Sequence, residues 1–298
     1  MIYFSALHDS DKVYILLPGN PGISELYYEF LVQFHEKYDK SIHLYAIDYM
    51  GHTIGAKALF LLEDQIEHAR RLIIRIKMNH PNATITLMGH SLGGFIALRL
   101  ESMAHHLILL FPAIDDLKST QNATNRLNRV LFTPIGILCI TILVYMTSVL
   151  PYIIKYKLIH YIEPRASHDQ LVILTRHWDY KLVKNTVGLT MDEYKHIGPL
   201  DLSKFQRQRH DSVQTSLNCK SNSKLIDKCL FLFTPFDGWC SISTFRQLSY
   251  TYPYKLINRD KLTSYNKSGI YLTPNNIPHA FVLGYSQQVC DIVHQLHQ

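Results

Sequence analysis

The sequence has little charge and no low-complexity segment. Asp, Glu, Lys and Arg make up 18% of its 298 residues, below the roughly 25% that is usual for soluble domains. Its hydrophobic fraction of 47% excludes a disordered, charged tail protein and is enough for a sizeable core. The 13 glycines and 12 prolines are too few for a collagen-like chain. The low charge indicates that part of the surface faces something other than water.

Paired cysteines, a basic block and a secretory signal are also missing. The five cysteines are odd in number and none has C-x-x-C spacing, which argues against a disulfide framework or a zinc site and suits a reducing compartment. The N-terminal residues lack the positive start and apolar run of a signal peptide. The net charge of +6 is spread thinly, so we expect no nucleic-acid partner and favour an anionic membrane surface.

Short apolar runs alternate with amphipathic patterns in the first part of the chain. Strands are expected at 13–17, 42–47, 84–88 and 106–110, and helices at 24–34, with Ser24 as N-cap, and at 61–78. Alternation at this spacing predicts βαβ units and a mostly parallel central sheet with helices on both faces.

The alternation then stops for more than a hundred residues. We interpret residues 117–228 as a largely helical, hydrophobic cap inserted into a single α/β domain that covers residues 1–298. Alternation resumes with a strand at 229–234, weaker strand candidates at 255–257 and 269–272, and a final helix near 286–295.

Residues 89–93 match the G-x-S-x-G pattern of a nucleophile elbow. The serine of an elbow lies in a strained turn from strand to helix, and only glycine leaves room for that turn. Here an apolar run precedes the motif and an apolar helix follows it. We therefore predict Ser91 as the nucleophile and the backbone N–H of Leu92 as a donor to the oxyanion. The alternative is a glycine-rich turn with a solvated serine.

Three segments together resemble the lipid-droplet-associated hydrolase family of the α/β-hydrolase superfamily. They are the elbow at 89–94, the Pro-Gly-Asn-Pro-Gly loop at 18–22 followed by Tyr27-Tyr28, and the Asp-Gly-Trp-Cys segment at 237–240. The resemblance covers nearly the whole chain, although the insertion matches in character only. It implies an α/β-hydrolase fold and a serine esterase for neutral lipids, with cholesterol esters as the suggested substrate, at lipid droplets and the endoplasmic reticulum.

The other two members of a Ser-Asp-His triad follow Ser91 in the order acid, then histidine. Asp237 lies just after the strand at 229–234, and we predict it as the acid; Asp115 and Asp116 are its rivals. His279 precedes the last helix, from where it can reach both Ser91 and Asp237.

The remaining histidines carry less information. His90 is interpreted as a packing residue, and His294 and His297 are expected on a solvated surface.

A second oxyanion donor is expected from the loop at 18–22. Pro18 and Pro21 have no N–H, which leaves Gly19, Asn20 and Gly22. By position we favour the backbone N–H of Asn20, with an ordinary tight turn as the alternative. The predicted chemistry needs no metal or organic cofactor.

Residues 130–154 contain no Asp, Glu, Lys or Arg and exceed the roughly 20 residues that cross a bilayer. A single crossing would separate Ser91 from Asp237 and His279. We therefore expect a hairpin or an in-plane helix broken at Pro134 and Pro151, on the cytosolic face of droplets or reticulum. A buried cap helix is the alternative. Basic residues flank the segment and would reach lipid head groups: Arg126, Arg129, Lys155 and Lys157.

Three functions remain open at this point. The first is a membrane-associated esterase for neutral lipid esters, with no obligate protein partner. The second is a binding or scaffolding protein of the lipid droplet with weak or vestigial esterase activity. The third is a soluble hydrolase of small esters, in which residues 130–154 simply form the cap.

Overall fold

The computed structural model describes residues 1–52, 58–125, 133–206, 225–257, 268–274 and 277–297. Within them lies a sheet of seven strands in the order β1-β3-β2-β4-β5-β6-β7. β1 pairs antiparallel with β3, and the other neighbouring pairs are parallel. The strand bounds are β1 Ile2–Phe4, β2 Lys12–Leu17, β3 His43–Ala46, β4 Thr84–His90, β5 His106–Leu110, β6 Cys229–Phe233 and β7 Gly269–Leu272.

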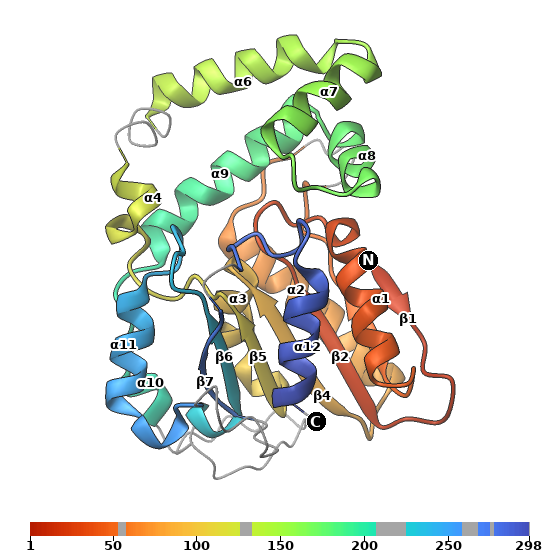
Figure 1. Cartoon of the computed structure of the whole chain (residues 1–298), viewed down its shortest axis with the longest axis vertical. Coiled ribbons are helices and arrows are strands. Elements are labelled where there is room, and N and C mark those ends of the chain that lie inside the picture. Colours follow the sequence, from red (N-terminus) through yellow and green to blue (C-terminus); the bar gives the residue numbers. More distant parts are fainter. Residues whose placement is uncertain (53–57, 126–132, 207–224, 258–267, 275–276, 298) are drawn as a thin grey trace.

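Both faces of the sheet are buried, which explains why its strands are apolar runs instead of alternating patterns. Val13, Ile15 and Leu17 of β2 belong to one buried cluster, and Tyr14 and Leu16 belong to the other. The first cluster is completed by α2 (Leu62–Asn79), α3 (Leu92–Arg99) and α11 (Ile242–Thr251). The second is completed by α1 (Tyr28–Lys37) and α12 (Ser286–Leu296), which lie side by side (Figure 1).

A helical layer joins β5 to β6 and covers one end of the sheet (Figure 1). We refer to it as the cap. Its helices are α4 (Gln121–Thr124), α6 (Pro134–Ser148), α7 (Tyr152–Ile162), α8 (His168–Arg176) and α9 (Tyr180–His196). α10 (Ser203–Gln206) follows them in the chain but lies away from this layer (Figure 1). Parallel strands end at the edge that the cap covers, and loops at that edge carry the binding residues of open α/β sheets.

The apolar segment at 130–154 folds as two helices in its described part. α6 ends at Ser148 and α7 starts at Tyr152, so Pro151 separates the two as the sequence predicts. Across the described residues, no helix combines the length and the apolarity needed to cross a membrane. Arg126, Arg129 and the first residues of the segment lie outside the described part.

The outer side of α6 is exposed, while its inner side packs on the rest of the cap, mainly on α9. Val144 is buried, Thr147 accepts a hydrogen bond from the Trp178 indole at 2.9 Å, and the rings of Tyr145 and Tyr180 lie 5.5 Å apart. Ile135 and Leu138, in contrast, are 76% and 58% exposed. One side of α6 is therefore buried and the other exposed, although the helix is apolar on all sides. This arrangement does not match the buried cap helix that the sequence left as an alternative.

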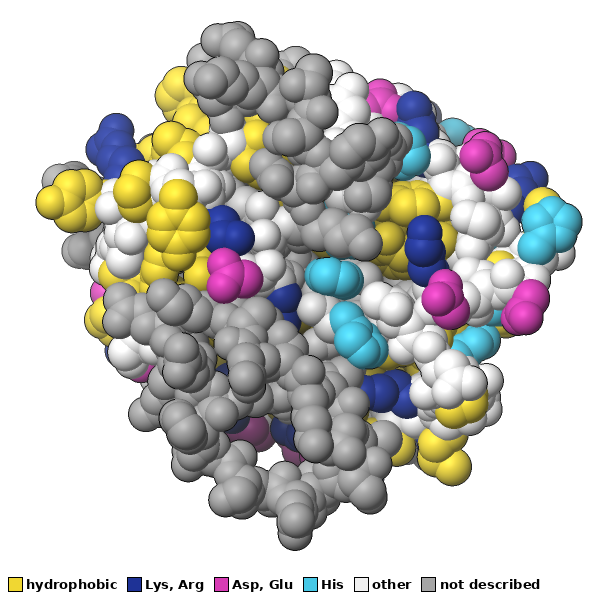
Figure 2. Space-filling view, turned by 90° about the horizontal axis from the view of Figure 1, so that it is seen from below, with side chains coloured by type: hydrophobic (Ala, Val, Ile, Leu, Met, Phe, Trp, Pro, Cys, Tyr) yellow, Lys and Arg dark blue, Asp and Glu magenta, His cyan; other side chains and the backbone are white. Residues whose placement is uncertain are grey.

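The opposite end of the molecule has a different surface. In the described part of that face, charged and histidine side chains are scattered among apolar ones (Figure 2). On the cap, in contrast, exposed apolar side chains follow one another along α6.

Three local expectations are wrong. Ser24 does not cap a helix; it begins a short 3₁₀ helix (Ser24–Tyr27), and its N–H donates to Asp48 at 2.8 Å. Residues 255–257 contribute one isolated bridge, Leu256 to Ile270, because the 3₁₀ helix Pro253–Lys255 interrupts any strand. His297 is buried and lies 3.2 Å from the Tyr14 hydroxyl, since α12 packs across the sheet.

Candidate active site

Ser91 occupies a strained turn between β4 and α3. Its φ of 53° and ψ of −118° lie in a region that side-chain-bearing residues rarely adopt. The turn also requires glycine at position 93, where a Cβ would lie 2.0 Å from the carbonyl oxygen of Leu17. At Gly89 a Cβ would lie 2.3 Å from the carbonyl oxygen of Gly93. The G-x-S-x-G pattern thus has a steric reason in this fold, and it presents the Ser91 hydroxyl at the end of the sheet.

His279 lies in the loop between β7 and α12, with its imidazole facing Ser91. Nε2 of His279 is 2.9 Å from Oγ of Ser91, and Nδ1 is 2.6 Å from Oδ2 of Asp237. A carboxylate accepts, so Nδ1 carries the proton in this arrangement and the lone pair of Nε2 faces the serine hydroxyl. The three side chains form one continuous hydrogen-bonded array, which brings together the residues that the sequence nominates.

Both carboxylate oxygens of Asp237 accept hydrogen bonds. Its second oxygen, Oδ1, accepts backbone hydrogen bonds from Trp239 and Cys240, each at 2.8 Å. Its side chain is fully buried, whereas that of His279 is 16% exposed. The carboxylate therefore has one orientation available, with Oδ2 directed at the imidazole.

Asp115 and Asp116, the alternative candidates for the acid, form hydrogen bonds with other groups. Asp115 accepts from the backbone N–H of Leu200 at 2.9 Å and from the Thr244 hydroxyl at 2.8 Å. Asp116 caps the 3₁₀ helix Leu117–Ser119 through the N–H of Lys118. Within the described chain, neither carboxylate contacts His279.

The loop at 18–22 lies against Ser91. A Cβ on Gly19 would be 3.1 Å from Cβ of Ser91. The N–H of Gly19 is already bound to the Tyr27 hydroxyl at 2.8 Å, and that of Gly22 to Nδ1 of His52 at 3.2 Å. Within the described residues, the backbone N–H groups of Asn20 and Leu92 have no acceptor. Of the three donors that the sequence allowed in this loop, Asn20 is the one left for an oxyanion.

His90 does more than the packing that the sequence indicates. It is buried, and its Nδ1 accepts from the Tyr27 hydroxyl at 2.6 Å while its Nε2–H donates to the carbonyl of His279 at 2.9 Å. Burial, and then the neighbouring His279, lower the pKa of His90 well below its ordinary value, which keeps the ring neutral. This network ties Gly19, Tyr27, His90 and His279 together. The sequence shows Tyr27 and His90 but gives no sign that they meet.

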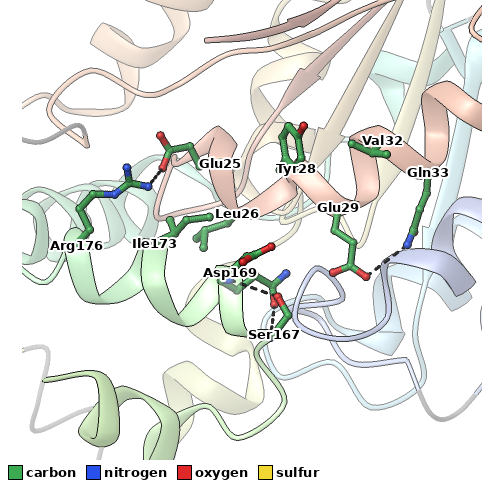
Figure 3. Close-up of a pocket in the computed structure, with 11 residues that line it drawn as sticks. Glu25, Leu26, Tyr28, Glu29, Val32, Gln33, Ser167, Asp169, Ile173 and Arg176 are labelled. Carbon is green, nitrogen blue, oxygen red and sulfur yellow. Dashed lines mark hydrogen bonds and ion pairs between the residues drawn. The ribbon is translucent and has the colours of Figure 1, made fainter. Parts of the chain in front are cut away.

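A separate groove runs between α1 and α8 (Figure 3). It encloses about 490 Å³. Arg176 pairs with Glu25 across it at 2.7 Å, and Glu29 lies 3.4 Å from Gln33 along its rim. Neither Ser91, Asp237 nor His279 lines it. No cluster of three or more His, Cys, Asp or Glu side chains that could hold a metal occurs in the part of the chain described.

Comparison with known proteins agrees with this architecture. The family model for "Lipid-droplet associated hydrolase" matches residues 10–282. A lipid droplet-associated hydrolase from Rattus norvegicus is 24% identical over 93% of this chain and 82% of its own. One from Dictyostelium discoideum is 24% identical over 97% of this chain and 88% of its own.

Solved structures show the same fold. An alpha/beta hydrolase fold protein from Burkholderia ambifaria superposes with a TM-score of 0.57 at 12% identity, covering 98% of this chain and 91% of that one. A membrane phospholipase A gives 0.57 at 14% identity, covering 97% and 79%. These likenesses confirm the expected α/β-hydrolase fold, and the family match confirms the resemblance seen in the sequence. The chain belongs to the lipid-droplet-associated hydrolase family.

Proposed function

We propose that this hydrolase is a serine carboxylic ester hydrolase that acts on neutral lipid esters, such as cholesterol esters, at the surface of lipid droplets. The observation that carries the proposal is the array in which Nε2 of His279 lies 2.9 Å from Oγ of Ser91 and Nδ1 lies 2.6 Å from Asp237. This is the geometry that a nucleophile, its general base and the residue that orients the base require.

The proposed reaction starts with proton transfer from Ser91 to Nε2 of a neutral His279. The alkoxide attacks the ester carbonyl, and the backbone N–H groups of Leu92 and Asn20 stabilise the oxyanion. The imidazolium, oriented by Asp237, then protonates the leaving alcohol. A water molecule, activated by His279, releases the acyl group by the same steps in reverse.

The exposed side of α6 supports action at a lipid surface. Ile142, Leu143 and Met146 are half or more exposed, and contiguous apolar surface of this kind marks a site of association. Each large side chain that leaves water stabilises the bound state by about 1.5–3 kcal/mol. Lys157 is exposed on α7, the next helix, and a basic residue near an anionic surface adds about 1 kcal/mol.

The order of the residues supports attachment from one side. Ser91 precedes the apolar segment at 130–154, and Asp237 and His279 follow it. α6 has 15 residues, which make about 22 Å of helix. That is shorter than the roughly 30 Å of a bilayer core. We therefore favour a helix that lies in the surface plane, on the cytosolic face of droplets and of the endoplasmic reticulum.

Two experiments test this function. Purified protein is assayed against emulsified cholesteryl oleate, triolein and a short-chain p-nitrophenyl ester. We expect turnover of the emulsified esters by the wild type and none by Ser91→Ala. A folded wild type that binds droplets without hydrolysing any of the three esters would instead identify a binding or scaffolding protein.

Flotation with phospholipid-coated triolein droplets tests the surface. Leu138→Asp, Ile142→Asp and Met146→Asp combined should move the protein to the soluble fraction, because all three side chains are exposed on α6. Val144 is not a useful target, since it is buried. Met78→Asp is the matched control, as Met78 is 75% exposed on α2. Equal flotation of the triple variant and the wild type would place the attachment outside α6, and a wild type that does not float would favour a soluble hydrolase.

A further inference from the structure

The side chain of Asn20 is held by the cap. Its Nδ2 lies 2.9 Å from the carbonyl oxygen of Thr186, 2.9 Å from Oγ1 of Thr190 and 3.0 Å from Oε1 of Glu193. The three partners are four and three residues apart on α9 and therefore share one face of that helix. The backbone N–H of the same asparagine is the donor left for an oxyanion, so α9 holds the donor residue directly.

The orientation of this amide follows from its partners. The Thr186 carbonyl can only accept, so the nitrogen and not the oxygen of the amide must face it. The Thr190 hydroxyl donates to that same carbonyl at 2.9 Å and keeps a lone pair for Asn20. Oε1 of Glu193 is the third acceptor, and the two hydrogens of Nδ2 are shared among the three.

Glu193 lies in an unusual place for a carboxyl group. It is buried, and among the described residues no lysine, arginine or histidine pairs with it. Burial is the main cause that raises its pKa to about 8. The hydrogen bond from Asn20 lowers this pKa, and the neighbouring Asp192 raises it further. The other titratable groups that feel its charge are Tyr49, in the loop after β3, and Tyr194 on α9. Near neutral pH the group is therefore an uncharged acceptor.

We propose that Glu193 is a positioning residue for the oxyanion hole: as a neutral acceptor for the Asn20 side chain, it fixes the loop at 18–22 against the cap. This proposal rests on the function proposed above. Glu193 acts through Asn20 and does not contact the reacting atoms. Its ionised form would place a negative charge beside the loop that must stabilise the oxyanion, and like charges in a buried site repel strongly.

The two forms of Glu193 predict a pH dependence. Turnover should fall as pH rises through about 8, when the carboxyl loses its proton. The sign follows from the transition state, because a second buried negative charge raises the energy of the oxyanion and leaves the neutral ester almost unaffected. kcat and kcat/KM should therefore fall together.

Glu193→Gln is the decisive variant, because glutamine has the shape of the protonated acid and keeps an acceptor oxygen. kcat for a soluble p-nitrophenyl ester is measured for wild type and variant over a pH range that brackets 8. We expect the variant to match the wild type within about twofold near neutral pH. Above pH 8 we expect it to stay active where the wild type declines.

Glu193→Leu removes the acceptor and should lower kcat about fivefold to tenfold at neutral pH with KM unchanged, because an Asn20 that is held less firmly stabilises the oxyanion less. Asp192→Asn is the matched control from the same helix. Asp192 accepts from the N–H of Leu62 at 3.0 Å and not from the loop at 18–22. Its neutralisation should keep the alkaline decline but move it to lower pH, since the charge that opposes ionisation of Glu193 is gone.

The outcomes separate this proposal from the proposed function. A wild type that neither hydrolyses the ester nor reacts with a fluorophosphonate would remove the function and the proposal together. A wild type that does both, with a Glu193→Gln variant that shows the same alkaline decline, would overturn the role of Glu193 and leave the function intact. Thermal unfolding of each variant at neutral pH identifies any loss that comes from misfolding.

Discussion

Replacing Asp237 by asparagine should reverse the direction of one hydrogen bond in the array. Oδ1 of Asp237 accepts from two backbone N–H groups, of Trp239 and Cys240, at 2.8 Å each. An asparagine must keep its oxygen on that side, since two donors face it there. Its NH₂ group then faces Nδ1 of His279, 2.6 Å away in the parent structure. Two donors cannot share that contact, so His279 must move its proton to Nε2.

The wrong tautomer is the source of the predicted loss. With a proton on Nε2, the imidazole can no longer accept the proton of Ser91, whose Oγ lies 2.9 Å away. In a serine–histidine–aspartate array this change costs about 10⁴-fold in rate, or about 5.5 kcal/mol of transition-state stabilisation. The fold should survive, because both backbone hydrogen bonds to the residue are retained.

The assay is kcat/KM for a p-nitrophenyl ester, with thermal unfolding to confirm the fold. Asp115→Asn is the matched control: Asp115 binds Leu200 and Thr244 and should affect stability more than rate. If Asp115→Asn or Asp116→Asn lost more activity than Asp237→Asn, the acid would follow β5 instead of β6. Activity of Asp237→Asn within tenfold of the wild type would also refute the reasoning.

Two further predictions concern stability. Gly93→Ala should destabilise the protein by more than about 2 kcal/mol in urea unfolding, because its Cβ would meet the backbone oxygen of Leu17 at 2.0 Å, whereas Gly198→Ala, which meets nothing within 4 Å, should change little. The wild type should lose stability relative to Glu193→Gln as pH rises from about 4.5 to about 8. In that range the unfolded chain releases the proton of Glu193 while the folded protein keeps it, because folding raises the pKa of this group. The difference in unfolding free energy should be absent near pH 4 and on the order of a few kcal/mol above pH 8; an equal difference at both pH values would contradict the burial argument.

Local patterns predicted the parts of the fold that depend on local structure. The runs at 106–110 and 269–272 form β5 and β7 with the expected bounds, since buried parallel strands are apolar throughout. β1 was missed because an edge strand of three residues carries no pattern of its own. The exposure of α6 was also hidden, since an apolar helix gives no periodicity from which to choose its buried side.

The candidate site divides in the same way. Ser91 could be nominated because the elbow is a continuous motif, and Asp237 and His279 because each follows a strand in the required order. The contacts of His90 with Tyr27 and of Glu193 with Asn20 join residues that are far apart in the sequence. Nothing in the local sequence distinguishes Glu193 from a solvated glutamate on a helix. Its burial depends on how the cap packs on the sheet.

Covalent labelling of the intact protein tests the central claim most directly. A fluorophosphonate reacts only with a serine that a base activates. The account predicts one adduct for each molecule of the wild type, located on the peptide that contains Ser91, and none on a folded Ser91→Ala variant. A wild type without an adduct, or a Ser91→Ala variant labelled to the same extent at another serine, would contradict the assignment of Ser91 as the nucleophile.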